Sequence, residues 1–158
     1  MNAIKIDDIK TFMNKLLLKD DFDSFLLEEA SITTYNTFTI DGHIMKAFYT
    51  NEEFDELESN TLSYWKAIKP ICFELIKGKK LPIKFKLVFK LDNKGISKLL
   101  SESNLPFNED EIAGLYLNIK YENNSLACIT ATSTTTFTLD KSLEKLWDEW
   151  MEKYINQL

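Results

Sequence analysis

The chain has 158 residues, of which 44% are hydrophobic, and a formal net charge of −6 at pH 7. This length suits one domain that folds around its own core without metal ions or disulfides, and no segment approaches the ~20 apolar residues of a membrane-spanning helix. All nineteen basic residues are lysines; without arginine, which reads base edges and clamps phosphates with a planar fork, base-specific recognition of DNA is not expected.

The first sixty residues predict a strand, a helix and a longer extended segment. A short strand at residues 3–6 precedes a helix that Asp7 can cap, because the apolar residues from Ile9 to Leu17 follow helical spacing. Residues 25–40 are rich in β-branched and aromatic side chains and predict extended structure, which Asp41 and Gly42 end in a turn. The acidic residues 51–59 predict a solvated loop or a short exposed helix.

The middle of the chain predicts a helix, a half-buried strand and a second helix. Apolar residues recur at helical spacing over 62–76, with Pro70 as a kink or restart and Gly78 after the end. Residues 83–91 alternate strictly, which predicts a strand with one apolar face. A short helix at 96–103 follows. The opposite face of the predicted strand carries Lys84, Lys86, Val88 and Lys90.

The last third predicts a hairpin and a long amphipathic helix. Strands at 115–121 and 126–138 are joined, through a turn at 122–124, and a helix begins after Asp140. One side of that helix carries Trp147, Trp150 and Tyr154. Two interpretations remain for this aromatic side: it closes over the sheet as core, or it is a face for a partner or a second copy.

The order of these elements predicts one α+β domain spanning residues 1–158, a mainly antiparallel sheet with helices packed on it. Two short motifs occur twice: TFTID at 37–41 and TFTLD at 136–140, and KIDD at 5–8 and KLDN at 90–93. They favour an internal repeat, with units 1–80 and 81–158 of the form strand-helix-strands-helix related by a pseudo-twofold axis.

Such paired units resemble one domain of the DNA sliding clamps, and residues 39–44 are similar to a turn of the bacterial clamps. The chain departs from that family because it is too short for a whole clamp protomer and has two additional long helices. It also resembles an uncharacterised bacterial family from Gram-positive anaerobes, a domain of unknown function. That resemblance covers nearly the whole chain, through residues 25–34, 70–79 and 137–144, and it implies no activity.

Catalytic and metal-binding patterns are sparse. The chain has one histidine, His43, and two cysteines, Cys72 and Cys128, whose apolar neighbours predict buried, reduced thiols. A His–Cys catalytic pair is possible in principle, but a histidine in a turn is more often simply exposed. The glycines are scattered and the Cys and His residues are not clustered, so we expect no cofactor and no metal site.

The segment from Lys66 to Lys90 is strongly basic inside an acidic protein, with a single acid, Glu74. One interpretation is an edge strand whose lysines resist aggregation; the other is a surface that binds an anion. The acids at 52–58 are an internal alternative, since they would neutralise the lysines if they folded over them. The candidate anion-binding residues are Lys77, Lys79, Lys80, Lys84, Lys86 and Lys90.

We therefore expect a non-enzymatic binding or assembly module, with a nucleic-acid backbone or an acidic protein as partner. A clamp-like accessory, with basic helices on one face of the sheet, is one form of this prediction. The alternative is a small-molecule hydrolase with a concave polar pocket. Residues 1–8 carry acids where a secretory signal needs an apolar stretch, so the expected location is cytoplasmic.

Overall fold

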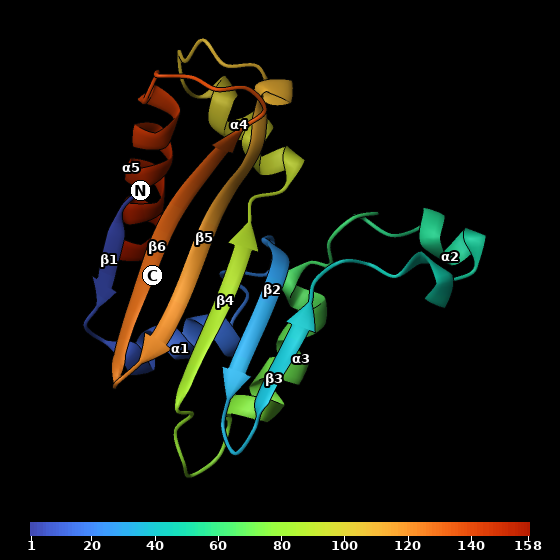
Figure 1. Ribbon diagram of the computed structural model, residues 1–158, viewed down its shortest axis with the longest axis vertical. Helices are drawn as coiled ribbons and strands as arrows, with labels where there is room; N and C mark the ends of the chain where they lie inside the picture. Colours follow the sequence, from blue (N-terminus) through green and yellow to red (C-terminus); the bar gives the residue numbers. More distant parts are fainter.

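Six strands form a single antiparallel sheet in the computed structural model, which describes residues 1–158 (Figure 1). Every neighbouring pair of strands is antiparallel, which confirms the predicted α+β class. Across the sheet the strands are β1 (Ala3–Ile6), β6 (Ser125–Thr134), β5 (Ile112–Glu122), β4 (Lys84–Lys90), β2 (Leu26–Thr33) and β3 (Thr37–Asp41).

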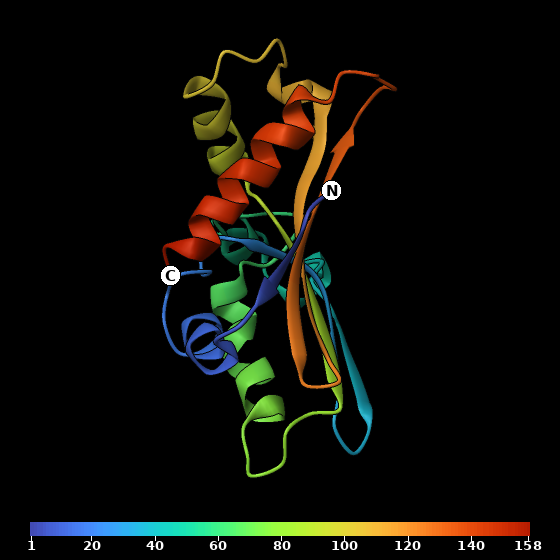
Figure 2. The ribbon, with the colours of Figure 1, turned by 90° about the vertical axis from the view of Figure 1, so that its left-hand side faces the viewer.

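The long helices all cover the same face of this sheet, as the side view in Figure 2 shows. They are α1 (Ile9–Leu17), α3 (Trp65–Ile76), α4 (Asn93–Ser101) and α5 (Ser142–Asn156). The short helix α2 (Asn51–Asp55) lies apart, on an arm formed by residues 43–62 that projects beyond β3 (Figure 1). The other face of the sheet, which we call the open face, therefore has no helix over it.

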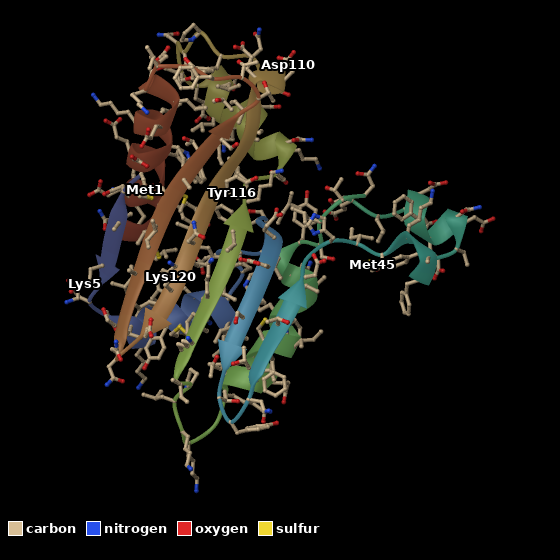
Figure 3. The ribbon with its side chains drawn as sticks, viewed as in Figure 1. Met1, Lys5, Met45, Asp110, Tyr116 and Lys120 are labelled. Atoms are coloured by element: carbon tan, nitrogen blue, oxygen red, sulfur yellow. The ribbon has the colours of Figure 1, made fainter.

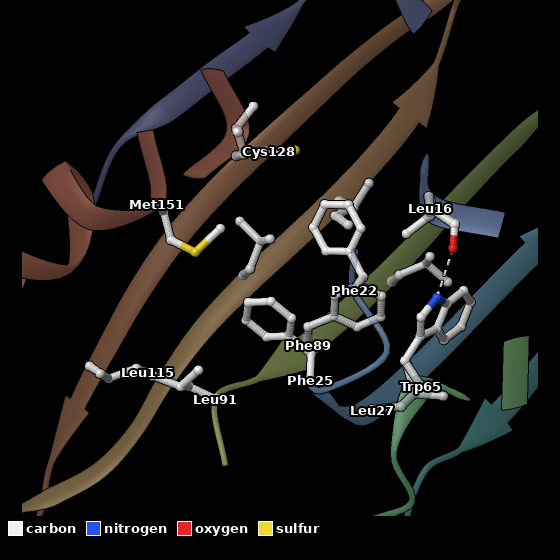
Figure 4. Close-up of a cluster of buried hydrophobic side chains, with 14 of the residues drawn as sticks. Leu16, Phe22, Phe25, Leu27, Trp65, Phe89, Leu91, Leu115, Cys128 and Met151 are labelled. Atoms are coloured by element: carbon white, nitrogen blue, oxygen red, sulfur yellow. Dashed lines mark hydrogen bonds between the residues drawn. The ribbon is translucent and has the colours of Figure 1, made fainter. Parts of the chain in front are cut away.

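Aromatic side chains fill the space between the helices and the sheet (Figure 4). Trp65 is fully buried, and its indole N–H donates a hydrogen bond of 2.9 Å to the carbonyl oxygen of Leu16. The rings of Phe22 and Phe25 lie within 6 Å of the ring of Phe89. A buried indole N–H without an acceptor would lower the stability of the fold. The Trp65 side chain therefore has two roles: its ring fills the core, and its hydrogen bond links α3 to α1.

Helix α5 packs onto the sheet through Trp147, which is fully buried and donates its indole N–H to the carbonyl oxygen of Tyr116 at 2.9 Å. Trp147 has no exposed surface that a partner could contact. The prediction that Trp147 belongs to a partner face is therefore wrong. Trp150 and Tyr154 are half-buried and stack at 5.3 Å, and the Tyr154 hydroxyl donates to the carbonyl of Asp21.

Several element boundaries differ from the predicted ones for local reasons. Asp8, and not Asp7, caps α1, because its carboxylate accepts the backbone N–H of Thr11. Residues 25–40 form two strands, since the chain turns between Thr33 and Thr37. Leu62 lies outside α3 because it pairs with His43 at the base of the arm, and β6 ends at Thr134.

The two halves share the element order strand-helix-strand-strand-helix, if α2 is left aside. Their first strands lie in different places: β4 pairs with β5 and β2 in the middle of the sheet, whereas β1 pairs only with β6 at the edge. A twofold axis between the halves would require equivalent positions, so the strand order does not have that symmetry. The duplication itself stays a prediction.

Candidate functional site

Strand β4 presents Lys84, Lys86 and Lys90 on the open face. Its alternate residues Phe85 and Phe89 point into the core, and the strand periodicity of two sends the lysines to the other side. The strand lies between β5 and β2, so the interpretation as an edge strand protected by lysines is wrong. Protection of a sheet edge therefore does not explain why β4 carries three lysines on one face.

The other three predicted lysines lie elsewhere. Lys77, Lys79 and Lys80 belong to the segment that joins α3 to β4, and Lys77 forms an ion pair of 2.8 Å with Glu74. Lys77 also lines a cavity on the helix-covered side of the sheet, with residues of α1 and α3. The structure thus divides the six candidates into two groups and does not form one continuous basic surface from them.

Two further lysines lie on the open face and were missed from the sequence. Lys120 of β5 lies directly opposite Lys86 of β4, and Lys5 of β1 is separated from Lys120 only by Ala127 of β6. Figure 3 looks onto this face and labels Lys5 and Lys120. The alternation of Leu117, Ile119 and Tyr121 with polar residues would have indicated the orientation of Lys120, but only the strand order brings it beside Lys86.

The acids near these lysines only partly balance them. Glu29 of β2 lies 3.5 Å from the ammonium of Lys86, and Glu122 is opposite Lys84 without forming an ion pair. The acidic segment 52–58 lies on the projecting arm and forms no ion pair with any candidate lysine; Glu53 instead caps α2 with Thr50. Internal neutralisation by that segment, one of the predicted alternatives, is therefore not observed.

A hollow of about 260 Å³ marks this part of the open face. Like charges directly opposite each other on neighbouring strands destabilise a sheet, so the Lys86–Lys120 pair favours an anion in the hollow between them. Hydroxyl and ammonium donors are the groups that bind phosphate or carboxylate oxygens. The polar lining residues of the hollow are Ser31, Lys84, Lys86, Lys120 and Glu122.

A second polar groove of about 550 Å³ runs along β2 and β3 and includes His43. The Nδ1 atom of His43 lies 2.6 Å from a carboxylate oxygen of Asp41, and Nε2 lies 4.0 Å from Glu28. The hydrogen bond to Asp41 raises the pKa of His43, and the hydrogen bonds from His43 lower the pKa of Asp41. The imidazole is 55% exposed, so this is a solvated hydrogen-bonded pair at the base of the arm.

The His43–Asp41 pair should give a measurable pH dependence. Because the folded-state pKa of His43 is raised, its contribution to stability is fully present below the unfolded value of about 6.5 and is lost as the pH rises through the folded pKa. Since His43 is the only histidine, an NMR titration of its ring protons reports this pKa directly. We expect a value above 6.5 that falls in Asp41→Asn; an unchanged pKa in that variant would contradict the pairing.

The structure does not pair His43 with either cysteine. Ser31 pairs with Thr39, whereas His43 lies two residues beyond Asp41, where β3 ends; both residues line the groove along β2 and β3. Both cysteines are completely buried and free, and burial raises the pKa of each thiol to about 12. The partners of His43 are the carboxylates of Asp41 and Glu28.

No group of three or more His, Cys, Asp or Glu side chains is arranged to hold a metal ion. None of the helices has both the length and the apolar character that crossing a membrane requires.

Comparison with known proteins places the chain in a family. A family model described as a family of unknown function, DUF5721, matches residues 15–158. No curated protein and no solved structure matches the chain. The matched residues include both groups of candidate lysines on β4 and in the segment before it, and all of α5. The match confirms the resemblance to an uncharacterised family: the chain belongs to the family of unknown function DUF5721.

Proposed function

We propose that this protein is a non-enzymatic binding module whose open sheet face binds an anionic partner, with a nucleic-acid backbone as the first candidate. The observation that carries the proposal is the direct opposition of Lys86 and Lys120 on a face that no helix covers. Such a pair of like charges lowers the stability of a sheet. An anion between the two ammonium groups would be attracted to both and would offset their mutual repulsion.

The composition of the face determines the kind of recognition. Lysine ammonium groups contact phosphates as point charges, and contacts to the backbone carry no sequence information. Tyr116 is the one aromatic side chain of the open face on β5, and the ammonium of Lys90 lies 5.8 Å from its ring centroid. Binding should therefore be salt-dependent and largely independent of base sequence.

The test is fluorescence anisotropy with a labelled single-stranded oligonucleotide and with the matching duplex. If three lysines contact phosphates, affinity should fall about 20- to 40-fold between 50 and 200 mM salt. The variant Lys84→Gln/Lys86→Gln/Lys120→Gln should lose most of the low-salt affinity with little change in stability, because it removes the Lys86–Lys120 repulsion and only an exposed ion pair of Lys86 with Glu29. A matched control removes three charges from the helix-covered side: Lys94→Gln/Lys98→Gln/Lys145→Gln.

The outcomes separate the candidate partners. Binding that the control retains and the open-face variant loses supports the proposal. If the wild type binds no nucleic acid but binds polyglutamate through the same lysines, the partner is an acidic protein. If the helix-side control loses nucleic-acid binding instead, a clamp-like arrangement with nucleic acid on the helices is favoured, although α5 carries four acids and two lysines. Failure to bind any polyanion contradicts the proposal.

A further inference from the structure

A cavity lined mainly by apolar residues lies on the other side of the sheet, between the helices and the ends of β4 and β5. Its volume is about 550 Å³, within the range of small-molecule sites. The floor is formed by the rings of Phe85 and Tyr121, which stack at 5.4 Å. The walls come from α1, α3 and the segment before β4, through the apolar residues Ile9, Met13, Leu17, Phe73, Ile76, Leu81 and Pro82.

The charged residues of this cavity are both basic. Lys10 of α1 and Lys77 at the end of α3 contribute to its lining, no acidic residue does, and the remaining polar residue is Asn124. Lys10 forms no ion pair, and the partner of Lys77 is Glu74, whose side chain is 64% exposed. An exposed ion pair of that kind contributes little free energy, so Lys77 can exchange its partner for a ligand anion.

Leu81 is an apolar residue of the cavity lining that is also exposed to solvent. It is 73% exposed and belongs to the segment that also carries Lys79 and Lys80. Apolar side chains exposed beside a cavity are typical of ligand-binding grooves. The cavity thus combines an apolar interior with two lysines in its lining, one of which, Lys77, pairs with Glu74 outside the lining.

We propose that this cavity binds a fatty acid, with the alkyl chain between α1, α3 and the Phe85–Tyr121 floor and the carboxylate at the rim beside Lys10 and Lys77. An apolar interior selects an alkyl chain, and a lining with two lysines and no acid selects an anionic head group over a cationic or neutral one once Lys77 exchanges Glu74 for the ligand. The site is independent of the proposed function, because it uses the helix-covered side of the sheet and none of the open-face lysines. Either can fail without the other.

The probe is laurate below its critical micelle concentration, with decanoate and octanoate as shorter homologues, measured by isothermal titration calorimetry. Affinity should fall about fourfold for each buried methylene removed. A cationic amphiphile with the same twelve-carbon chain should bind at least tenfold more weakly than laurate. The double variant Lys10→Gln/Lys77→Gln should weaken laurate binding about threefold to tenfold, whereas Lys145→Gln/Lys153→Gln on α5 should remain within about twofold of wild type.

A second pair of variants tests the cavity itself. Ile76→Trp should fill it and abolish binding; circular dichroism shows whether this variant folds. Leu81→Asp changes an exposed position, so it should fold and should weaken laurate at least tenfold by placing a carboxylate beside the ligand. Phe137→Asp is the matched control, since Phe137 is 89% exposed and lies in another loop.

Three results would overturn the inference. The first is the absence of binding by any of the three carboxylates at millimolar concentration. The second is equal binding of the cationic amphiphile, which would show that the lysines do not select the head group. The third is binding to phosphatidylglycerol vesicles without binding of free laurate, which would assign the apolar and basic residues to a lipid surface.

Discussion

Replacing Trp147 with alanine is expected to lower the free energy of unfolding by about 3–5 kcal/mol. Trp147 is fully buried and stacks on Trp150 with ring centroids 5.5 Å apart. Its removal opens a cavity under α5 and also leaves the carbonyl of Tyr116 without the indole donor that bonds to it at 2.9 Å. Because small domains have a total stability of about 5–15 kcal/mol, this change is a large share of the whole.

Urea denaturation followed by circular dichroism measures the effect, with Phe137→Ala as control. Phe137 is 89% exposed, so its removal should change the free energy of unfolding by no more than about 0.5 kcal/mol. Deleting residues 141–158 removes α5 entirely and should abolish the cooperative transition. If the truncated protein melted cooperatively near the wild-type temperature, α5 would be an appendage and its aromatic side a partner face.

Replacing Gly42 with alanine is expected to be comparably damaging, at about 3 kcal/mol or more. A Cβ atom at Gly42 would lie 1.7 Å from the carbonyl oxygen of Leu27 and 2.6 Å from its carbonyl carbon. Both are backbone atoms of β2, so no side-chain rotation can relieve the overlap. The same residue links β2 to the segment before α3, because its N–H donates to the carbonyl of Glu28 and its carbonyl accepts the N–H of Ser63.

Gly114→Ala is the matched control for this prediction. The atoms nearest to its added Cβ belong to the Tyr116 ring, which lies on the uncovered face and can rotate away, so we expect a loss of about 1 kcal/mol or less. Thermal unfolding compares the two variants, and hydrogen exchange at Ser63 reports whether the base of the arm has opened in Gly42→Ala. Equal stability of the two variants would show that β2 can shift to admit a methyl group at residue 42.

Local patterns were sufficient to predict most of the helices and strands. Strict alternation over β4 and the apolar stripe of α5 gave the correct element types, because both reflect burial of one face of a regular structure. The errors occurred where one local pattern was compatible with two different structures. Residues 25–40 have uniform strand character, and only the pairing of Ile32 with Phe38 across the turn shows that they form a hairpin.

In the candidate site, too, local patterns predicted some features and only the tertiary structure showed the others. The sequence identified Lys84, Lys86 and Lys90 as sharing one strand face, which the structure confirms for β4. It could not include Lys120, because that residue is adjacent only through the β4–β5 register. It also grouped Lys77 with the β4 lysines by closeness along the chain, whereas Lys77 directly follows α3 and lines the cavity on the helix-covered side.

The sequence by itself determined the α+β class, the apolar face of each element and the absence of arginine from every surface, since these depend on composition and on periods of two and 3.6 residues. The tertiary structure alone decided that β4 is central and β1 peripheral, that one sheet face is open, and that Lys86 meets Lys120. Strand order and register join residues far apart in the chain, and a local period of side chains contains no information about which strand lies beside which.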